Sequence, residues 1–308
     1  MIEPDEILDA IESQPQPEES PRQYLGASEI GDPCARKLWL KFHNYIEPEQ
    51  FDNRKRRLFF RGHREEPVLE TLLESIGFEI IKSCLDQVGF KRGFFAGHGD
   101  GVYEYKGKRV AIEFKTHSLK QFDLLERGKL HETHQKHYAQ ATIYQKEFNC
   151  DYALYVAVCK NDDRIFLDVI EFNEDHYKEY CDKAEFVTMS DKPPERIASK
   201  ATDFRCKFCH AHAVCWGMEL PRVDCRNCTS VAKNQAKGEF YCEKKENKEL
   251  DKSGFCGHHS FNPYAMQDLL GYSPVEFFPK ERAVKYKKPD GSEITNGFNF
   301  VRSKDLTI

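Results

Sequence analysis

The sequence contains no long apolar run. No stretch approaches the roughly 20 consecutive apolar residues that a membrane-spanning helix needs. The N-terminal segment from Met1 to Glu6 is acidic and lacks the basic and apolar regions of a secretory signal. We therefore expect a soluble, cytoplasmic protein with no membrane partner. Thiols stay reduced in that compartment, so the 12 cysteines predict metal or cluster binding rather than disulfides.

An excess of positive charge is also lacking. The formal net charge is -5, which excludes a protein that coats nucleic acid through a uniformly basic surface. Contacts with phosphate would have to come from local patches. The best candidate for DNA binding comprises Arg54, Arg56, Arg57 and Arg61. Phe59 and Phe60 lie in the same segment, where they could either stack on bases or pack in the core.

The sequence does contain two carboxylates and a lysine within one predicted hairpin. Residues 102–105 and 109–114 are predicted strands, separated by a turn at residues 106–108. Side chains alternate across a strand, so Glu113 and Lys115 share one face, while Asp100 lies at the mouth of the partner strand. A Glu and a Lys spaced by one are also common in exposed hairpins. Together with Asp100, however, they suit Mg2+ or Mn2+, which binds carboxylates, polarises a phosphodiester and activates water.

Two predicted helices flank this hairpin. Apolar residues at 68, 69, 72, 73 and 76 predict a helix, and Glu66 at its start could offer a third carboxylate to the metal. Glu65 and Glu66 would equally suit the positive end of a helix dipole. A second helix from about residue 131 to 148 places Gln140 and Tyr144 on adjacent turns of one face. There they could contact the DNA backbone or support Lys115.

Four motifs in this order resemble those of RecB-like nucleases in the PD-(D/E)XK superfamily. They are Gly62-x3-Glu66, Gly99-Asp100-Gly101, Glu113-x-Lys115 and Gln140-x3-Tyr144. The resemblance covers about residues 24–216. It implies an α/β protein with a restriction-endonuclease-like core, in which helices flank a mixed central sheet. By motif match Asp100, Glu113 and the Phe114 carbonyl would bind metal, and Lys115 would be catalytic. Many four-cysteine members place a His at the first motif, whereas this chain offers Glu66, with His63 nearby, as in the lambda-exonuclease and YqaJ-like branch.

Eight cysteines form two sets, of which the first joins distant parts of the chain. It comprises Cys34, Cys206, Cys209 and Cys215. This irregular spacing suits an iron-sulfur cluster better than zinc, although the neighbouring His210 and His212 keep zinc open. The set is similar to the iron-sulfur staple of RecB-like nucleases, including the AddAB nuclease subunit and CRISPR-associated exonucleases, which implies a 4Fe-4S cluster. Because Cys34 and Cys206 close a very long loop, the cluster would act as a folding clasp.

The second set predicts a structural zinc module. Its five candidate ligands, of which four suffice, are Cys225, Cys228, Cys242, Cys256 and His259. A C-x2-C pair followed by later ligands is typical of tetrahedral Zn2+ sites. For the fourth position, Cys256 is favoured over His259. No recognition helix is evident, so the module is predicted to be a scaffold rather than a reader of DNA sequence.

Four regions follow from these anchors. Residues 1–22 form a mobile acidic arm, residues 23–220 the nuclease domain, residues 221–263 the zinc module, and residues 264–308 a helix and hairpin tail. In the nuclease domain we expect strands over 152–159 and 164–172 and a helix over 174–189. In the tail we expect a helix over 266–270 and a hairpin that pairs residues 284–286 with 298–301.

The predicted activity is metal-dependent DNA end processing, with an exonuclease favoured. Linear DNA, single- or double-stranded, would be the substrate, and a helicase or single-strand annealing protein would suit as partner. Residues 24–34 also resemble bacteriophage-encoded members, which implies viral DNA recombination, repair or degradation in the host cytoplasm. Two alternatives stay open: a structure-selective endonuclease with the same site, and a non-catalytic DNA-binding adaptor on a nuclease scaffold.

Overall fold

The computed structural model describes residues 3–15, 22–246, 248–251 and 254–308. Its largest sheet has five strands in the order β2-β5-β6-β7-β8. Their bounds are Glu79–Lys82, Gly101–Tyr105, Lys108–His117, Tyr152–Cys159 and Ile165–Glu171. Strands β6 and β7 are parallel, and the other neighbours are antiparallel. The mixed sheet predicted from the sequence is therefore confirmed.

The predicted hairpin is β5-β6, with a tighter turn than expected. Tyr105 pairs with Lys108, which leaves only Lys106 and Gly107 as the loop. Both have a positive φ, 51° and 72° respectively. Two consecutive left-handed residues make the turn whose twist matches that of the flanking strands. The strand β6 then continues to His117, three residues beyond the predicted end.

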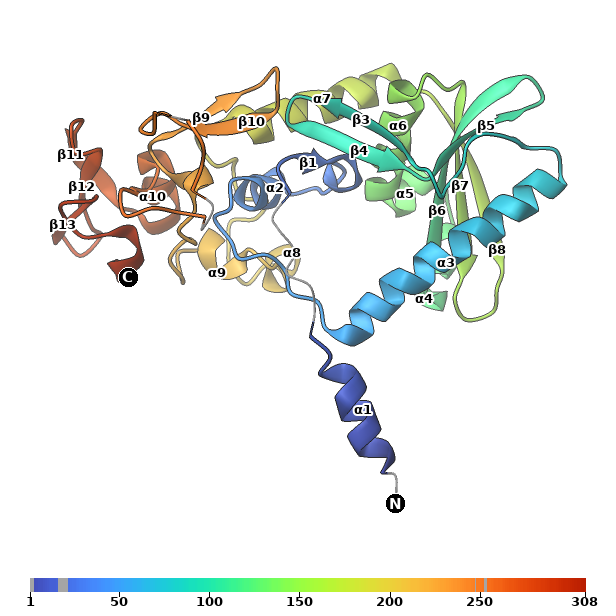
Figure 1. Ribbon diagram of the computed structural model, residues 1–308, viewed down its shortest axis with the longest axis horizontal. Helices are drawn as coiled ribbons and strands as arrows, with labels where there is room; N and C mark the ends of the chain where they lie inside the picture. The colour runs from blue at the N-terminus through green and yellow to red at the C-terminus, as the bar shows by residue number, and fades with distance from the viewer. Residues whose placement is uncertain (1–2, 16–21, 247, 252–253) are drawn as a thin grey trace.

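Helices cover both faces of the sheet (Figure 1). On one face α3 (Asn53–Ser75) packs Leu69 and Leu73 against Ile112, Phe114 and Val156. On the other face α6 (Gln135–Glu147) packs against β6 and β7, and α7 (Glu174–Met189) packs against α6. Helix α3 begins earlier than the predicted stretch, because the Asp52 side chain caps it by accepting a 2.7 Å hydrogen bond from the Lys55 amide. Pro67 lies inside this helix.

A smaller sheet, in the order β1-β4-β3, was not predicted from the sequence. Its strands are Leu25–Gly26, Phe95–Gly99 and Val88–Arg92. Glycines weaken the strand pattern of β4, yet packing requires them, because a Cβ on Gly97 would lie 2.8 Å from the Tyr144 ring and one on Gly99 2.6 Å from the Phe148 ring. This close approach delivers Asp100, the next residue, to the start of β5.

Among the other elements predicted within residues 23–220, β7 and α7 match their expected bounds, and β8 is one residue shorter at each end. The helix expected over 131–148 is divided into α5 (Leu130–Thr133) and α6 by the non-helical backbone of His134 (φ -136°, ψ 63°). Short helices complete this region: η1 (Ala27–Glu29), α2 (Ala35–Phe42), α4 (Leu119–Leu125), α8 (Phe204–Lys207) and α9 (His212–Cys215).

The C-terminal part contains η2 (Cys225–Asn227), the hairpin β9 (Val231–Asn234) and β10 (Glu239–Cys242), and α10 (Pro263–Leu270). A three-stranded sheet follows, formed by β11 (Ser273–Phe278), β12 (Ala283–Lys287) and β13 (Glu293–Asn296), and the chain ends after η3 (Ser303–Asp305). The expected pairing of 284–286 with 298–301 is wrong. The tight turn in which the Lys288 amide donates to the Ser292 carbonyl at 2.8 Å makes residues 293–296 the partner of β12 instead.

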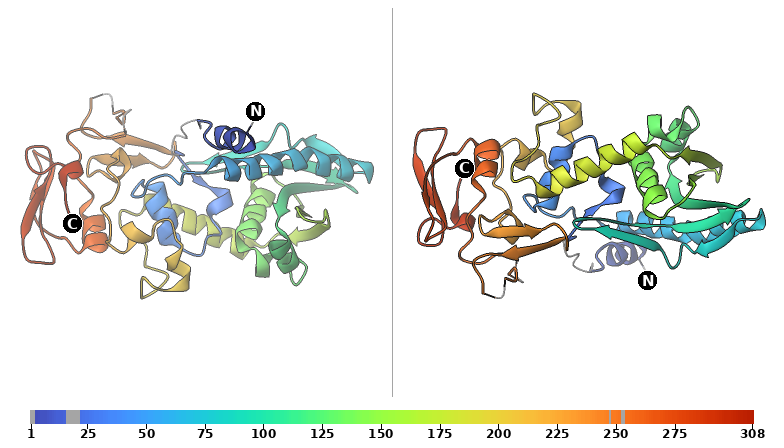
Figure 2. Two further views of the ribbon diagram at one scale, coloured as in Figure 1. Left: turned by 90° about the horizontal axis from the view of Figure 1, so that it is seen from below. Right: turned by 90° about the horizontal axis from the view of Figure 1, so that it is seen from above.

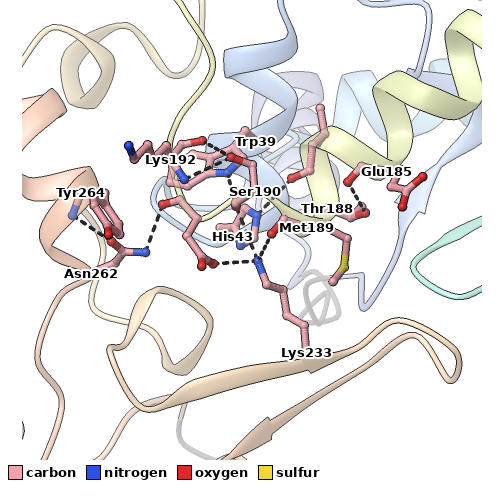
Figure 3. A network of polar contacts seen from close by, with 12 residues as sticks. Trp39, His43, Glu185, Thr188, Met189, Ser190, Lys192, Lys233, Asn262 and Tyr264 are labelled. Atoms are coloured by element: carbon pink, nitrogen blue, oxygen red, sulfur yellow. Dashed lines mark hydrogen bonds and ion pairs between the residues drawn. The ribbon is translucent and has the colours of Figure 1, made fainter.

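The C-terminal part shares one core with the part of the chain that contains the five-stranded sheet. Figure 2 nevertheless shows this sheet and the C-terminal three-stranded sheet at opposite ends of the molecule. Phe261, Met266 and Leu269 belong to the same buried cluster as Trp39 and Leu40 of α2. Polar contacts reinforce this junction (Figure 3). Lys233 of β9 donates to the Met189 carbonyl at the end of α7 (2.8 Å) and pairs with Asp191 (3.0 Å).

Within the predicted N-terminal arm, Pro4–Glu12 forms helix α1, which buries none of its residues. It meets the start of α3, where Asn53 donates to the Gln14 carbonyl at 3.1 Å and Arg57 pairs with Glu12. Residues 1, 2 and 16–21 of the arm lie outside the described residues. None of the helices in the described part of the chain combines the length and the apolarity that crossing a membrane demands.

Candidate active site

Asp100, Glu113 and Lys115 lie together at the junction of β4, β5 and β6. The register that pairs Gly101 with Ile112 places Asp100 beside β6, and its Oδ2 accepts a 2.7 Å hydrogen bond from the Phe114 amide. Glu113 and Lys115 project from the same face of β6, as strand alternation requires. Lys115 pairs with Glu113 Oε1 and donates to the Phe114 carbonyl at 3.1 Å. Both carboxylates are buried, Glu113 being 2% exposed.

Burial and like charge dominate the electrostatics of this cluster. Burial, followed by the neighbouring Asp100, raises the pKa of Glu113 to about 8, with Lys115 acting in the opposite direction. Burial also disfavours the charge of Lys115, but Glu113 and Asp100 outweigh it and raise the pKa of the ammonium. Within the described residues, Glu113 Oε2 is buried and has no hydrogen-bond partner. Such an oxygen is costly to bury, and a bound cation would relieve that cost.

Glu66 brings a third carboxylate to the cluster from α3. Burial and the charge of Asp100 raise its pKa, while His63 lowers it through a 3.1 Å contact with Glu66 Oε1. Oxygen donors of this kind suit Mg2+ or Mn2+. As the side chains stand, no three His, Cys, Asp or Glu residues in the described ranges are arranged to hold a metal ion. Lys115 and His63 occupy one oxygen each of Glu113 and Glu66.

Gln140 and Tyr144 form a buried layer behind the acidic cluster. Gln140 Nε2 donates to the Tyr144 hydroxyl at 3.3 Å. Burial, followed by the charge of Glu113, raises the pKa of Tyr144, which places its hydroxyl within the field of the cluster. Both side chains are buried. Of the two roles that the sequence allowed, burial favours support of the site over direct contact with DNA.

Sequence reasoning missed a group of histidines next to this site. His117 follows Glu113 and Lys115 on the same face of β6, a signal that the alternating pattern could have given. The Tyr155 hydroxyl shares hydrogen bonds with His117 Nε2 (2.7 Å) and His137 Nδ1 (2.8 Å). Tyr155 also pairs with Glu113 in the strand register. The buried polar lining therefore extends from the carboxylates along β6 and β7.

The four predicted DNA-binding arginines all lie on the first half of α3. Arg61 donates to the Lys160 carbonyl at 3.0 Å, Arg57 pairs with Glu12, and Arg56 Nε donates to the Phe51 carbonyl at 3.4 Å. Arg54 occupies the first turn of the helix. Phe59 and Phe60 are exposed, so these two aromatic residues do not belong to the core.

The first cysteine set is gathered beside α2. Cys34 caps this helix, its sulfur accepting from the Lys37 amide at 3.4 Å, and Cys215 accepts from Arg36 Nε at 3.2 Å. Burial raises the pKa of Cys206 and of Cys209, and the charges of Cys34 and Cys215 raise both further. His210 and His212 each direct Nε2 to a backbone carbonyl, at 2.7 and 3.0 Å. Four neighbouring thiols fit the donor set of an iron-sulfur cluster.

The second cysteine set surrounds a cavity of about 90 Å³. Cys225, Cys228, Cys242 and Cys256 line it, together with His258 and His259. His259 uses both ring nitrogens elsewhere, Nδ1 with the Ser303 hydroxyl (2.8 Å) and Nε2 with Asn227 Oδ1 (2.9 Å). The ring of His259 is thus engaged elsewhere, which leaves the four cysteines as the candidate zinc ligands of this set.

Comparisons with known proteins find distant structural likeness. No protein-family model matches the chain, and no curated protein matches it. Among solved structures, SSO0001 is 16% identical, with 68% of this chain and 90% of that one covered and a TM-score of 0.35. The alkaline exonuclease LHK-Exo from Laribacter hongkongensis, alone and in complex with dAMP, is 13% identical, with 54% and 86% covered and a TM-score of 0.40. Likeness this low decides neither the fold nor the activity of this chain.

Proposed function

We propose that the protein is a Mg2+- or Mn2+-dependent deoxyribonuclease of the RecB-like PD-(D/E)XK type. The observation that carries the proposal is Glu113, a buried carboxylate with one oxygen paired to Lys115 and the other without a partner in the described residues. Asp100, Glu113, Glu66 and the Phe114 carbonyl would hold the metal. When bound, the metal would polarise the scissile phosphate and activate a water.

Lys115 would be the catalytic group. Its ammonium is held by Glu113 and by the Phe114 carbonyl, so it stays at the site and stays charged. From there it can orient the attacking water or stabilise charge on the phosphate in the transition state. Gln140 and Tyr144 would fix the wall against which Glu113 lies.

A non-catalytic adaptor explains this arrangement less well. DNA binding alone has no use for two buried carboxylates whose mutual repulsion and desolvation destabilise the fold. Of the catalytic alternatives we favour an exonuclease that processes DNA ends, as the motif resemblance implies. A viral role in recombination, repair or degradation, with a helicase or annealing protein as partner, extends this proposal.

Two further metal centres belong to the proposal. Cys34, Cys206, Cys209 and Cys215 would bind a 4Fe-4S cluster that ties α2 to α8 and α9. Cys225, Cys228, Cys242 and Cys256 would bind zinc in the cavity that they line. Both would act on stability, because binding to the folded chain alone stabilises that state.

The test is digestion of end-labelled linear DNA, single- and double-stranded, with Mg2+ or Mn2+, by anaerobically purified protein. Lys115→Ala should reduce cleavage by about 100-fold or more, the effect typical of losing one charge-stabilising group. Lys108→Ala at the other, exposed end of β6 serves as the matched control and should cut normally. Closed circular DNA should survive if a free end is needed. Equal activity of the Lys115→Ala variant and the wild-type protein would refute the assigned site.

A further inference from the structure

Helix α3 consists of two halves with different surroundings. Its buried residues, Leu69, Glu70 and Leu73, all lie in the second half. None of the residues from Asn53 to Gly62, which we call the protruding half of α3, is buried. This half nevertheless carries Leu58, Phe59 and Phe60, which are 45%, 48% and 63% exposed. Packing among the described residues therefore does not account for three large apolar side chains in a row.

The helix leaves the sheet at Arg61 and Gly62. Arg61 donates to the carbonyl of Lys160, the residue that follows the last residue of β7. A Cβ on Gly62 would lie 3.8 Å from Thr116 Oγ1, near the end of β6. The part of α3 that precedes these two residues extends past the carboxyl ends of β6 and β7, toward α1 (Figure 1). The protruding half thus presents its side chains outward, beside the end of the sheet that holds the acidic site.

The chemistry of the protruding half is aromatic and basic. Besides its two phenylalanines it contains Arg54, Lys55, Arg56, Arg57 and Arg61, and Arg64 follows one turn later. Phe59 meets the edge of Phe51 (centroids 5.2 Å apart), and the Arg64 guanidinium lies 5.4 Å from the Phe60 ring centroid. Exposed rings among guanidinium groups are what a nucleic-acid strand with unstacked bases requires, because the rings stack on bases and the cations attract phosphates.

The face that carries Phe59 also leads to the acidic site. Residues 59, 62, 63 and 66 follow each other at helical spacing, so Phe59 and Glu66 lie on one face, about 10 Å apart along the axis. Between them Gly62 carries no side chain, and among the described residues outside its own helix a Cβ there would meet only Thr116 Oγ1, at an ordinary contact distance of 3.8 Å. A nucleotide backbone can pass close to the helix at this point. The separation corresponds to about two or three nucleotides of a stacked strand.

We propose that the protruding half of α3 binds single-stranded DNA, with Phe59 stacking on a base about two or three nucleotides from the scissile phosphate at the acidic site. This inference rests on the proposed function, which makes DNA the substrate. The ligand is a single strand because the base faces of a duplex are already stacked on one another. Arg57 is engaged with Glu12, so the proposal rests on Phe59, Gly62 and the path to Glu66.

The experiment measures binding rather than cleavage. Fluorescence anisotropy of a labelled oligothymidylate and of a labelled blunt duplex is recorded with Ca2+ in place of Mg2+. Phe59→Leu should weaken single-strand binding about 5- to 100-fold, as expected for losing one stacked base, and leave duplex binding unchanged. Phe59→Tyr keeps the ring and should bind like the wild-type protein. Phe277 is also an exposed phenylalanine, on β11 (58% against 48% for Phe59), so Phe277→Leu is the matched control and should have no effect.

The outcomes separate this inference from the proposed function. If the wild-type protein cuts DNA while Phe59→Leu keeps full single-strand affinity, single-strand binding by the protruding half of α3 is refuted and the proposed nuclease function is kept. If Phe59→Leu loses single-strand affinity and the wild-type protein cuts no DNA, single-strand binding by the protruding half of α3 is supported and the proposed nuclease function is refuted. Equal loss of single-strand and duplex affinity, or a change of oligomeric state in Phe59→Leu, would assign this face to another role and overturn the inference.

Discussion

Two buried charged side chains at opposite ends of the molecule, Glu113 and Arg36, have opposite surroundings. At the sheet end, Asp100 and Glu113 are buried close to each other, and one oxygen of Glu113 has no partner among the described residues. At the cysteine-rich end, Arg36 is 1% exposed and fully engaged, with the Pro194 carbonyl (2.8 Å), the Cys215 sulfur (3.2 Å) and Asp268. A buried charged group without enough partners indicates a functional site, whereas one with a full set of partners stabilises the fold.

This contrast predicts that changes at the sheet end affect activity and changes at the cysteine-rich end affect stability. The largest expected effect is that of Glu113→Ala. It should reduce DNA cleavage at least about 1000-fold, because the metal loses a central ligand. The free energy of unfolding should change little, because the removal of a desolvated carboxylate offsets the loss of its pair with Lys115, whose side chain is 28% exposed. Gel-based digestion and urea denaturation measure the two quantities.

Glu104→Ala provides the control for Glu113→Ala. Glu104 is an exposed carboxylate on the neighbouring strand β5 and should be dispensable for both properties. If Glu113→Ala unfolded the protein instead of inactivating it, the carboxylate would be a structural group and the contrast between the two ends would fail.

The second largest effect concerns the first cysteine set. Cys209→Ser should lower the free energy of unfolding by several kcal/mol and abolish the visible absorption of the proposed cluster, since it would remove a link between distant parts of the chain. Iron and sulfide analysis with thermal unfolding, both under anaerobic conditions, checks this. Cys181→Ser, outside both sets, should keep iron and stability. If the purified protein contains zinc but neither iron nor sulfide, the first cysteine set is a zinc site and not an iron-sulfur site.

The smallest expected effect is acid sensitivity at the junction of Figure 3. Burial, then the nearby charge of Lys233, lowers the pKa of His43 to about 3, while its Nε2 donates to the Val187 carbonyl at 3.1 Å. A lowered histidine pKa contributes stability above pH 6.5 that is lost as the pH falls toward 3. One pH unit below the ordinary value, His43 should cost about 1.4 kcal/mol.

His43→Gln isolates this contribution, because the amide keeps a donor for Val187 and does not titrate. Urea denaturation above and below the ordinary histidine pKa should show the variant losing about 1.4 kcal/mol less stability than the wild-type protein on acidification. Equal acid sensitivity of the two proteins would mean that His43 is not buried uncharged at this junction.

The sequence predicted those features whose signals are local. Alternation placed Glu113 and Lys115 on one face, and continuous patterns located β7 and α7 to the residue. Features that depend on distant contacts were missed. The glycines of β4 make sense only against Tyr144 and Phe148. Likewise, residues 298–301 have strand-like composition, but the tight turn before β13 fixes an earlier pairing. The exposure of Phe59 depends on the extension of α3 beyond the sheet, which no local pattern indicates.

The contact between Arg36 and Asp268 has a consequence for anyone who shortens the gene. A chain ended near residue 220 would keep every motif of the acidic site and would look like a minimal enzyme. It would also lose α10, and with it the carboxylate that neutralises Arg36 and the side chains of Met266 and Leu269. An arginine stranded in the interior costs several kcal/mol. We expect such a truncated product to collect in inclusion bodies, so the smallest useful gene fragment must extend through the codons for α10.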